Sequence, residues 1–259
     1  MRLPIDDLRR VSSDYIKHLM YQLQTIDKDN TVLEHAPLIR GAAIILQYLT
    51  EHKTIGLTQT KAFQRKFVRW AAEEFAWPGF DLDGYFSVSK VMNEYDFAPL
   101  ELLHFIMLKL KLIRHYKSSC RLTKIGAQMA DKPGDLYNLI APFYLFEIDH
   151  GVLSRVPDPL IGNWGVFLSV LNVETEMGIS TARLRSILYG RPDAGDVFDR
   201  TEHMIESQLL RPLCWIGVLA ALDADAREHP PQRTYFKTPL WRAAFMFPND
   251  PQVEQPTRH

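Results

Sequence analysis

The side chains that most often carry out chemistry are present in this chain, but their spacing predicts no catalytic or metal site. The nine histidines include no HExxH or similar metal-ligating spacing. The adjacent pairs Asp149-His150 and Glu202-His203 point to different faces of a helix. The carboxylate pairs Glu94/Asp96 and Glu147/Asp149 have no evident partner. Because nucleophile-elbow, phosphate-loop and dinucleotide motifs are also absent, we expect a protein that is not an enzyme and has no cofactor and no metal.

Two clusters of cationic side chains are candidates for binding nucleic acid. The first follows one face of a helix predicted over residues 61–75 and comprises Lys61, Arg65, Lys66 and Arg69. The second lies around a predicted hairpin and comprises Arg114, His115, Lys117, Arg121 and Lys124. The net charge of −1 gives no overall attraction to nucleic acid, so any such site must be a local basic patch. Each cluster is also compatible with an ordinary solvated face. In the first cluster, Glu73-Glu74 dilute the positive charge.

A segment that the chain uses three times positions these residues. Each copy is an apolar helix, a short strand and a second helix that begins with threonine; the copies begin at Pro37, at Pro99 and, in weaker form, at Gln208. Thr58 or Thr60 is expected to N-cap the helix that follows the first strand. A hairpin over residues 114–123 followed by the Leu-Thr-x-x-Gly start at Leu122 is typical of the later part of a winged-helix domain. We therefore predict a mainly α fold of repeated winged-helix-like units with short β-hairpins.

Composition and sequence patterns predict the class of protein and its domain boundaries. Hydrophobic residues at 46% and charged residues at 24% are typical of a globular protein. The sequence contains neither a secretory pattern nor an apolar run of bilayer length, so we expect a cytoplasmic protein with no membrane partner. Cys120 and Cys214 are expected to be reduced thiols. We predict an N-terminal helix within 1–35, two winged-helix-like units in 36–150, a C-terminal helical region with a third, degenerate unit in 151–248, and a loose tail over 249–259.

The pentapeptide Gln59-Thr60-Lys61-Ala62-Phe63 resembles the short motif by which bacterial proteins bind the replication sliding clamp. In that motif the glutamine bonds at a pocket rim, while a small aliphatic and an aromatic side chain fill the pocket. The motif prefers leucine where this chain has Ala62, which weakens pocket filling by about 1–2 kcal/mol. Phe63 also shares a helical stripe with Phe67 and Trp70, so its ring has two interpretations, a buried core residue or an anchor that becomes available when the first helical turn frays.

With this pentapeptide and the repeated units, the chain resembles the SocB toxins of bacterial SocAB toxin–antitoxin systems. The resemblance covers about residues 36–190 and is strongest at Gly56–Trp70, Asn93–Phe97 and Arg121–Gly126. It implies a non-enzymatic toxin that occupies the partner groove of the DNA polymerase III sliding clamp (the beta subunit) and blocks replication elongation. It also implies an antitoxin that acts as a proteolytic adaptor to the ClpXP protease. By motif position, the clamp contacts would be Gln59, Ala62 and Phe63.

Two other functions stay open at this point. One is a winged-helix DNA-binding regulator that uses either cationic cluster, with DNA as its partner. The other is a non-catalytic scaffold for protein interactions, because winged-helix domains serve both purposes and the fold alone does not choose between them. The exposure of Phe63 is the observation that separates a clamp anchor from a core residue.

Overall fold

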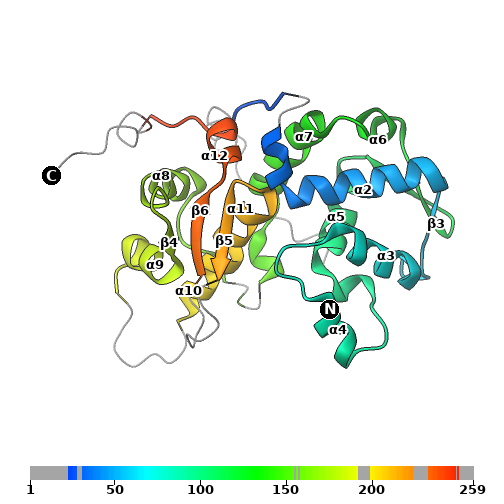
Figure 1. Ribbon diagram of the computed structural model, residues 1–259, viewed down its shortest axis with the longest axis horizontal. Coiled ribbons are helices and arrows are strands. Elements are labelled where there is room, and N and C mark those ends of the chain that lie inside the picture. Colours follow the sequence, from blue (N-terminus) through cyan, green and yellow to red (C-terminus); the bar gives the residue numbers. More distant parts are fainter. Residues whose placement is uncertain are drawn as a thin grey trace. The chain divides into compact units, whose positions relative to one another are not determined.

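The computed structural model describes residues 23–27, 31–154, 156, 158–191, 199–223, 233–248 and 250. The described chain is mainly helical, with short strands in antiparallel sheets (Figure 1), which confirms the expected fold class at this level. Of the predicted N-terminal helix, residues 1–22 lie outside the described residues, as does the predicted tail apart from Asp250. None of the described helices is long and apolar enough to cross a bilayer.

The chain divides into two compact units. The first comprises residues 26–141, and the second comprises residues from 142 onward together with residues 23–25. The elements of the first unit are η1 (Thr31–His35), α2 (Pro37–His52), β1 (Ile55–Gly56), α3 (Arg65–Phe75), α4 (Leu82–Val88), η2 (Glu94–Asp96), α5 (Ala98–Lys109), β2 (Ile113–Tyr116), β3 (Ser119–Leu122), α6 (Lys124–Met129) and most of α7 (Pro133–Phe146).

Helix α2 is the centre of the first unit. Pro37 stands in its first turn, where the missing amide N–H would have had no helical partner. Its buried apolar side chains include Leu38, Ile45 and Leu46, and the helix packs against α3 and α5. Burial of each such side chain stabilises the fold by about 1.5–3 kcal/mol. The apolar pattern of α2 and α5 therefore supplies the core on which the sheet is built.

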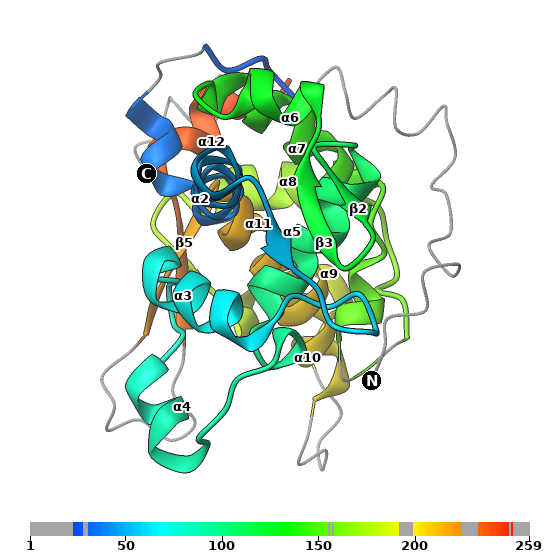
Figure 2. The same ribbon diagram turned by 90° about the vertical axis from the view of Figure 1, so that its right-hand side faces the viewer.

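The sheet of the first unit joins the first two sequence copies. β1, from the first copy, pairs antiparallel with β3, from the second, with Ile55 opposite Cys120. β3 also pairs with β2 in the predicted hairpin, which gives the order β1-β3-β2 (Figure 2). The prediction that residues 36–150 form two units is therefore corrected. A two-residue strand such as β1 cannot form a sheet by itself, and each copy supplies what the other lacks.

The Leu-Thr-x-x-Gly start behaves as predicted in the second copy. The Thr123 hydroxyl donates to the Lys111 carbonyl (2.6 Å) and accepts from the Gly126 amide (3.0 Å). Thr123 therefore both caps α6 and joins the two ends of the hairpin. A Cβ at Gly126 would lie 2.1 Å from the Leu112 carbonyl oxygen. Glycine is therefore required there by the close approach of α6 to the start of β2.

The threonines of the first copy do not cap a helix, so that prediction was wrong. Residues 58–62 instead form a tight turn in which the Thr58 amide donates to the Ala62 carbonyl (2.8 Å). Lys61 has a φ of 66°, a left-handed conformation that no helix start accommodates. Helix α3 begins only at Arg65, after an extended Gln64 whose side chain makes no capping bond.

The second unit has the same order of elements. Its sheet runs β4-β6-β5. Its elements are η3 (His150–Leu153), α8 (Trp164–Glu174), β4 (Ile179–Ser180), α9 (Thr181–Tyr189), α10 (Arg200–Ile205), the π-helical η4 (Glu206–Leu210), α11 (Arg211–Ile216), β5 (Leu219–Asp223), β6 (Arg233–Lys237) and α12 (Pro239–Ala244). The third sequence copy corresponds to α11 to α12. There the Thr238 hydroxyl donates to the Gly217 carbonyl (2.6 Å) and accepts from the Leu240 amide (3.2 Å), as Thr123 does in the first unit.

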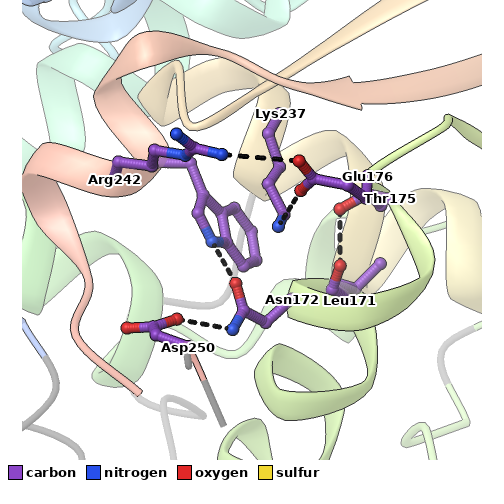
Figure 3. Close-up of polar contacts among 8 residues, drawn as sticks. Leu171, Asn172, Thr175, Glu176, Lys237, Arg242 and Asp250 are labelled. Carbon is purple, nitrogen blue, oxygen red and sulfur yellow. Dashed lines mark hydrogen bonds and ion pairs between the residues drawn. The ribbon is translucent and has the colours of Figure 1, made fainter. Parts of the chain in front are cut away.

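Polar contacts fasten α12 and β6 to α8 within the second unit (Figure 3). The buried Asn172 accepts from the indole of Trp241 (3.0 Å) and donates to Asp250 (2.7 Å). Glu176, just beyond α8, pairs with Lys237 (2.9 Å) and Arg242 (3.4 Å), and this pairing lowers its pKa. These bonds satisfy the buried polar atoms of the α8–α12 contact, so this cluster has a structural role.

Candidate nucleic-acid interface

Phe63, the aromatic residue of the clamp-like pentapeptide, is a core residue. Its side chain is 1% exposed, and its backbone pairs with that of Leu57. Its ring stacks on the ring of His104 with centroids 3.9 Å apart. Gln59 is exposed and Ala62 is half-buried. The structure thus selects the core interpretation of Phe63, and the ring is not available to a partner in this conformation.

Glu94 holds the Phe63 segment in place. One of its carboxylate oxygens accepts from the Phe63 amide (2.5 Å), and the other lies 2.5 Å from Nδ1 of His104. Glu94 and His104 are 4% and 6% exposed. Nε2 of His104 in turn lies 2.9 Å from Nε2 of His115 on β2. A continuous chain of hydrogen bonds therefore runs from the Phe63 backbone through Glu94 and His104 to the hairpin.

The His104–His115 contact limits the charge of the pair. One hydrogen between the two Nε2 atoms makes the bond, whereas two imidazolium rings would put two N–H groups face to face. Burial lowers the pKa of His115, and the charges of His104 and Lys61 act in the same direction. The lowered pKa favours the neutral form of His115, whose Nε2 can share the single hydrogen of this contact between α5 and the hairpin.

The first predicted cationic cluster is not a single helical stripe. Lys61 leaves the helical stripe, and its ammonium donates to the Lys117 carbonyl at the hairpin tip (2.7 Å). Arg65 donates to Asn93 (2.8 Å), and Arg69 pairs with Glu73 (3.0 Å). Lys66 is exposed at the start of α3. The predicted helical stripe of Lys61, Arg65 and Arg69 is thus wrong for Lys61, because α3 starts only at Arg65.

Three cations of the second predicted cluster lie around an aromatic ring, that of Tyr116. Arg114 and Arg121 stand opposite each other across β2 and β3. Tyr116 is 41% exposed, and the cationic groups of Arg121, Lys117 and Arg114 lie 4.3, 5.6 and 6.0 Å from its ring centroid. These four residues, Arg114, Tyr116, Lys117 and Arg121, are called the hairpin cluster below. Lys124 is exposed just beyond β3.

The charges of the hairpin cluster are not neutralised by neighbouring side chains. Within the described part of the chain, no carboxylate forms an ion pair with its two arginines or its lysine. Nε of Arg121 is shielded from solvent and has no hydrogen-bond partner among the described residues. Unpaired cations around an exposed tyrosine attract a ligand with negative charge and planar groups.

The tip of the hairpin is fixed to the body of the first unit. The Ser118 carbonyl accepts from the Leu57 amide (2.8 Å), and the Lys117 carbonyl accepts from Lys61. Lys117 adopts a φ of 53°, as a two-residue turn requires. Together with the His104–His115 bond, these contacts hold the hairpin on the loop that precedes α3.

Two family models match the chain. The description of the first is Y4jL N-terminal domain, over residues 34–135, and that of the second is y4jL C-terminal domain, over residues 154–239. A relative named Uncharacterized protein y4jL, from Sinorhizobium fredii (strain NBRC 101917 / NGR234), is 36% identical over 162 residues, which are 62% of this chain and 74% of the relative. The chain belongs to the Y4jL family. No solved structure matches it.

The Y4jL domain matches lie within the two structural units. The N-terminal match contains the hairpin cluster and the chain from Phe63 to His115, and the C-terminal match contains both strands of the β5–β6 pair. The candidate interface therefore belongs to the N-terminal domain of the family. Among the described residues, no group of three or more histidine, cysteine or acidic side chains is arranged to hold a metal ion.

Sequence reasoning missed the partnership of Glu94, His104 and His115. Glu94 has no evident partner in the sequence because its two donors come from the Phe63 backbone and from the next helix. A signal was present at His104, which interrupts an apolar run on α5 and so must bury a polar ring that needs a partner. Tyr116 was also missed, although its position between Arg114 and Lys117 in a hairpin places it on the same face as Arg114.

Proposed function

We propose that this Y4jL-family protein binds nucleic acid through the hairpin cluster. The observation that supports this most is the gathering of Arg114, Lys117 and Arg121 around the exposed residue Tyr116. Among the described residues, no carboxylate forms an ion pair with any of these three cations. Guanidinium and ammonium groups bind phosphate oxygens, and an aromatic ring supplies a surface for a base. The overall charge of −1 means that attraction comes from this local patch.

We also propose that each unit is a winged-helix domain. In the first unit the order is helix, strand, three helices and a hairpin, with the first strand pairing with the last, and the second unit repeats this order in its β4-β6-β5 sheet. The β2–β3 hairpin takes the position of the wing. A winged-helix fold does not by itself indicate nucleic-acid binding, because the fold has many uses. The proposed function therefore rests on the hairpin cluster.

Matched charge variants test the proposed function. The variant Arg114→Ala/Lys117→Ala/Arg121→Ala removes the cations of the hairpin cluster. A control, Lys90→Ala/Arg183→Ala/Arg191→Ala, removes three exposed cations elsewhere in the described chain and lowers the net charge equally. Fluorescence anisotropy with labelled oligonucleotides should show at least about tenfold weaker binding for the first variant and little change for the control. Equal binding by the two variants would contradict the proposal.

Replication-clamp binding by Gln59, Ala62 and Phe63 is a second, separate proposal, together with the toxin activity and the adaptor and ClpXP partners that it implies. Because Phe63 is buried, clamp binding needs residues 57–63 to leave Glu94 and the hairpin turn at Lys117 and Ser118. A variant with a weakened Glu94 contact, Glu94→Gln, should then bind purified clamp more tightly than the wild-type chain does. Failure of both proteins to bind in a titration would remove this proposal and leave the first untouched.

A further inference from the structure

The helix that follows α3 and α4 in the first unit has little surface with which to read a duplex. In α5 only Ala98 and Lys109 are exposed, and residues such as Leu102, Leu103 and Ile106 are fully buried. Insertion of a helix into a major groove needs an exposed face of polar and basic side chains. The helix α5 lacks such a face, so base contacts in the first unit must come from another element.

The hairpin is also poorly suited to enter a minor groove. Each strand has four residues, and the turn at Lys117 and Ser118 is held to the body through both of its carbonyl groups. A hairpin that inserts into a groove must project from the body, whereas this one lies on the loop that precedes α3. Its outer face is a short, fixed surface.

That outer face has the composition of a platform for unpaired bases. The side chains of Arg114, Tyr116 and Arg121 share it, because Arg114 faces Arg121 across the strands and Tyr116 is two residues from Arg114. The guanidinium of Arg121 lies over the Tyr116 ring at 4.3 Å and so supports the ring in one orientation. Tyr116 is 41% exposed, and a second planar group can stack where its ring is open to solvent.

We infer that the hairpin cluster binds single-stranded nucleic acid, with an unpaired base stacked on Tyr116 and the neighbouring phosphates on Arg114, Lys117 and Arg121. This inference rests on the proposed nucleic-acid binding and adds the class of strand. Single strands suit a small platform because each base presents a planar face without groove insertion, and stacking tolerates any sequence. DNA and RNA share this chemistry.

Tyrosine variants of the full-length chain test the inference. The probes are labelled DNA and RNA oligonucleotides of about 12 nucleotides, single-stranded and as blunt duplexes of the same sequence. We expect wild-type protein to prefer the single strands, Tyr116→Leu to weaken single-strand binding about 5- to 100-fold, and Tyr116→Phe to keep it within about twofold. Duplex binding should change little in either variant. Circular dichroism confirms that the variants are folded.

The outcomes separate the inference from the function on which it rests. Tighter binding to duplex than to single strands, or equal losses on both substrates in Tyr116→Leu, would overturn the inference and leave nucleic-acid binding intact. Absence of binding to all four probes by the wild-type chain would remove both. A preference for the RNA or the DNA single strand that depends on Tyr116 supports the inference and identifies the natural strand.

Discussion

Glu94 shows how one buried carboxylate decides the state of several residues. It accepts hydrogen bonds from the Phe63 amide and from His104, which belong to segments far apart in the sequence. Charged acceptors of this kind form strong bonds, and loss of the charge leaves two buried donors competing for one oxygen. The carboxylate therefore stabilises both the burial of Phe63 and the anchoring of the hairpin through His115.

The first prediction concerns this carboxylate. Glu94→Gln should lower the free energy of unfolding by about 3 kcal/mol, because it removes one partner of a buried charged contact. Glu101→Gln, on α5, is the matched control: burial and the charge of Glu94 raise the pKa of Glu101, so neutralising it should cost little. Urea unfolding of the variants measures both effects, and equal midpoints for Glu94→Gln and the wild type would contradict the account of the site.

Buried His150 gives a second prediction, on pH. Burial lowers its pKa to about 3, with the charge of Arg211 adding to the effect. The unfolded chain, with a histidine pKa of roughly 6.5, therefore binds the proton more readily than the folded chain, and stability falls as pH falls below that value. Between about pH 7 and about pH 5, this one group should account for a loss of about 2 kcal/mol. The loss should be smaller by that amount in His150→Gln, and equal losses in urea unfolding would contradict the assignment.

At the scale of elements, the sequence was informative where the interactions are local. The hairpin over residues 114–123 and the cap at Thr123 were predicted correctly because turn chemistry and capping depend on neighbours in the sequence. The pairing of β1 with β3 was missed, because it joins two copies that each looked like a unit. The turn at residues 58–62 was missed because its Leu57-Thr58 pair resembles the Leu122-Thr123 pair that starts α6. The first copy has Lys61 at the position of the required glycine, Gly126, and its chain forms a turn there instead of a helix.

The threonine caps give a prediction at this scale. Thr123→Ala should lower the free energy of unfolding by about 1–2 kcal/mol, because the Gly126 amide and the Lys111 carbonyl both lose a partner. Thr238→Ala should have a similar effect in the second unit. Thr123→Ser keeps the hydroxyl and should cost less than half as much. Thermal or urea unfolding compares the three variants. If Thr123→Ser lowers the free energy of unfolding as much as Thr123→Ala does, the loss of the hydroxyl is not the cause of the destabilisation.

Gly126 gives a further prediction in the same element. Gly126→Ala places a Cβ against the backbone carbonyl of Leu112, which cannot move without shifting the start of β2. We expect a loss of about 1–3 kcal/mol by overpacking, although alanine favours helices. Gly84→Ala is a useful comparison, since the three atoms nearest to an added Cβ there belong to a side chain, that of Asp81, and not to the backbone. A stabilised Gly126→Ala protein would contradict the close approach of α6 to β2.

For the whole molecule, two Y4jL domain matches correspond to two units with the same order of elements and the same strand order. The repeat in the sequence predicted shared architecture but counted its first two copies as separate units, whereas the helix and strand of one and the helix and hairpin of the other together form the first unit. Only the cations of the candidate interface were predicted from the sequence. The hairpin cations were found from their spacing, whereas their aromatic centre and the anchoring histidines depend on tertiary contacts.

The dependence of nucleic-acid affinity on salt tests the central claim most directly. For binding through phosphates, a plot of log affinity against log salt is linear, with a slope of about −0.7 to −0.9 for each phosphate contacted. The account predicts a steep slope for the wild-type chain and a slope shallower by about 2 to 3 for Arg114→Ala/Lys117→Ala/Arg121→Ala, with the control triple unchanged. Identical slopes for the wild-type chain and the hairpin-cluster variant would contradict the claim that these three cations hold the phosphates.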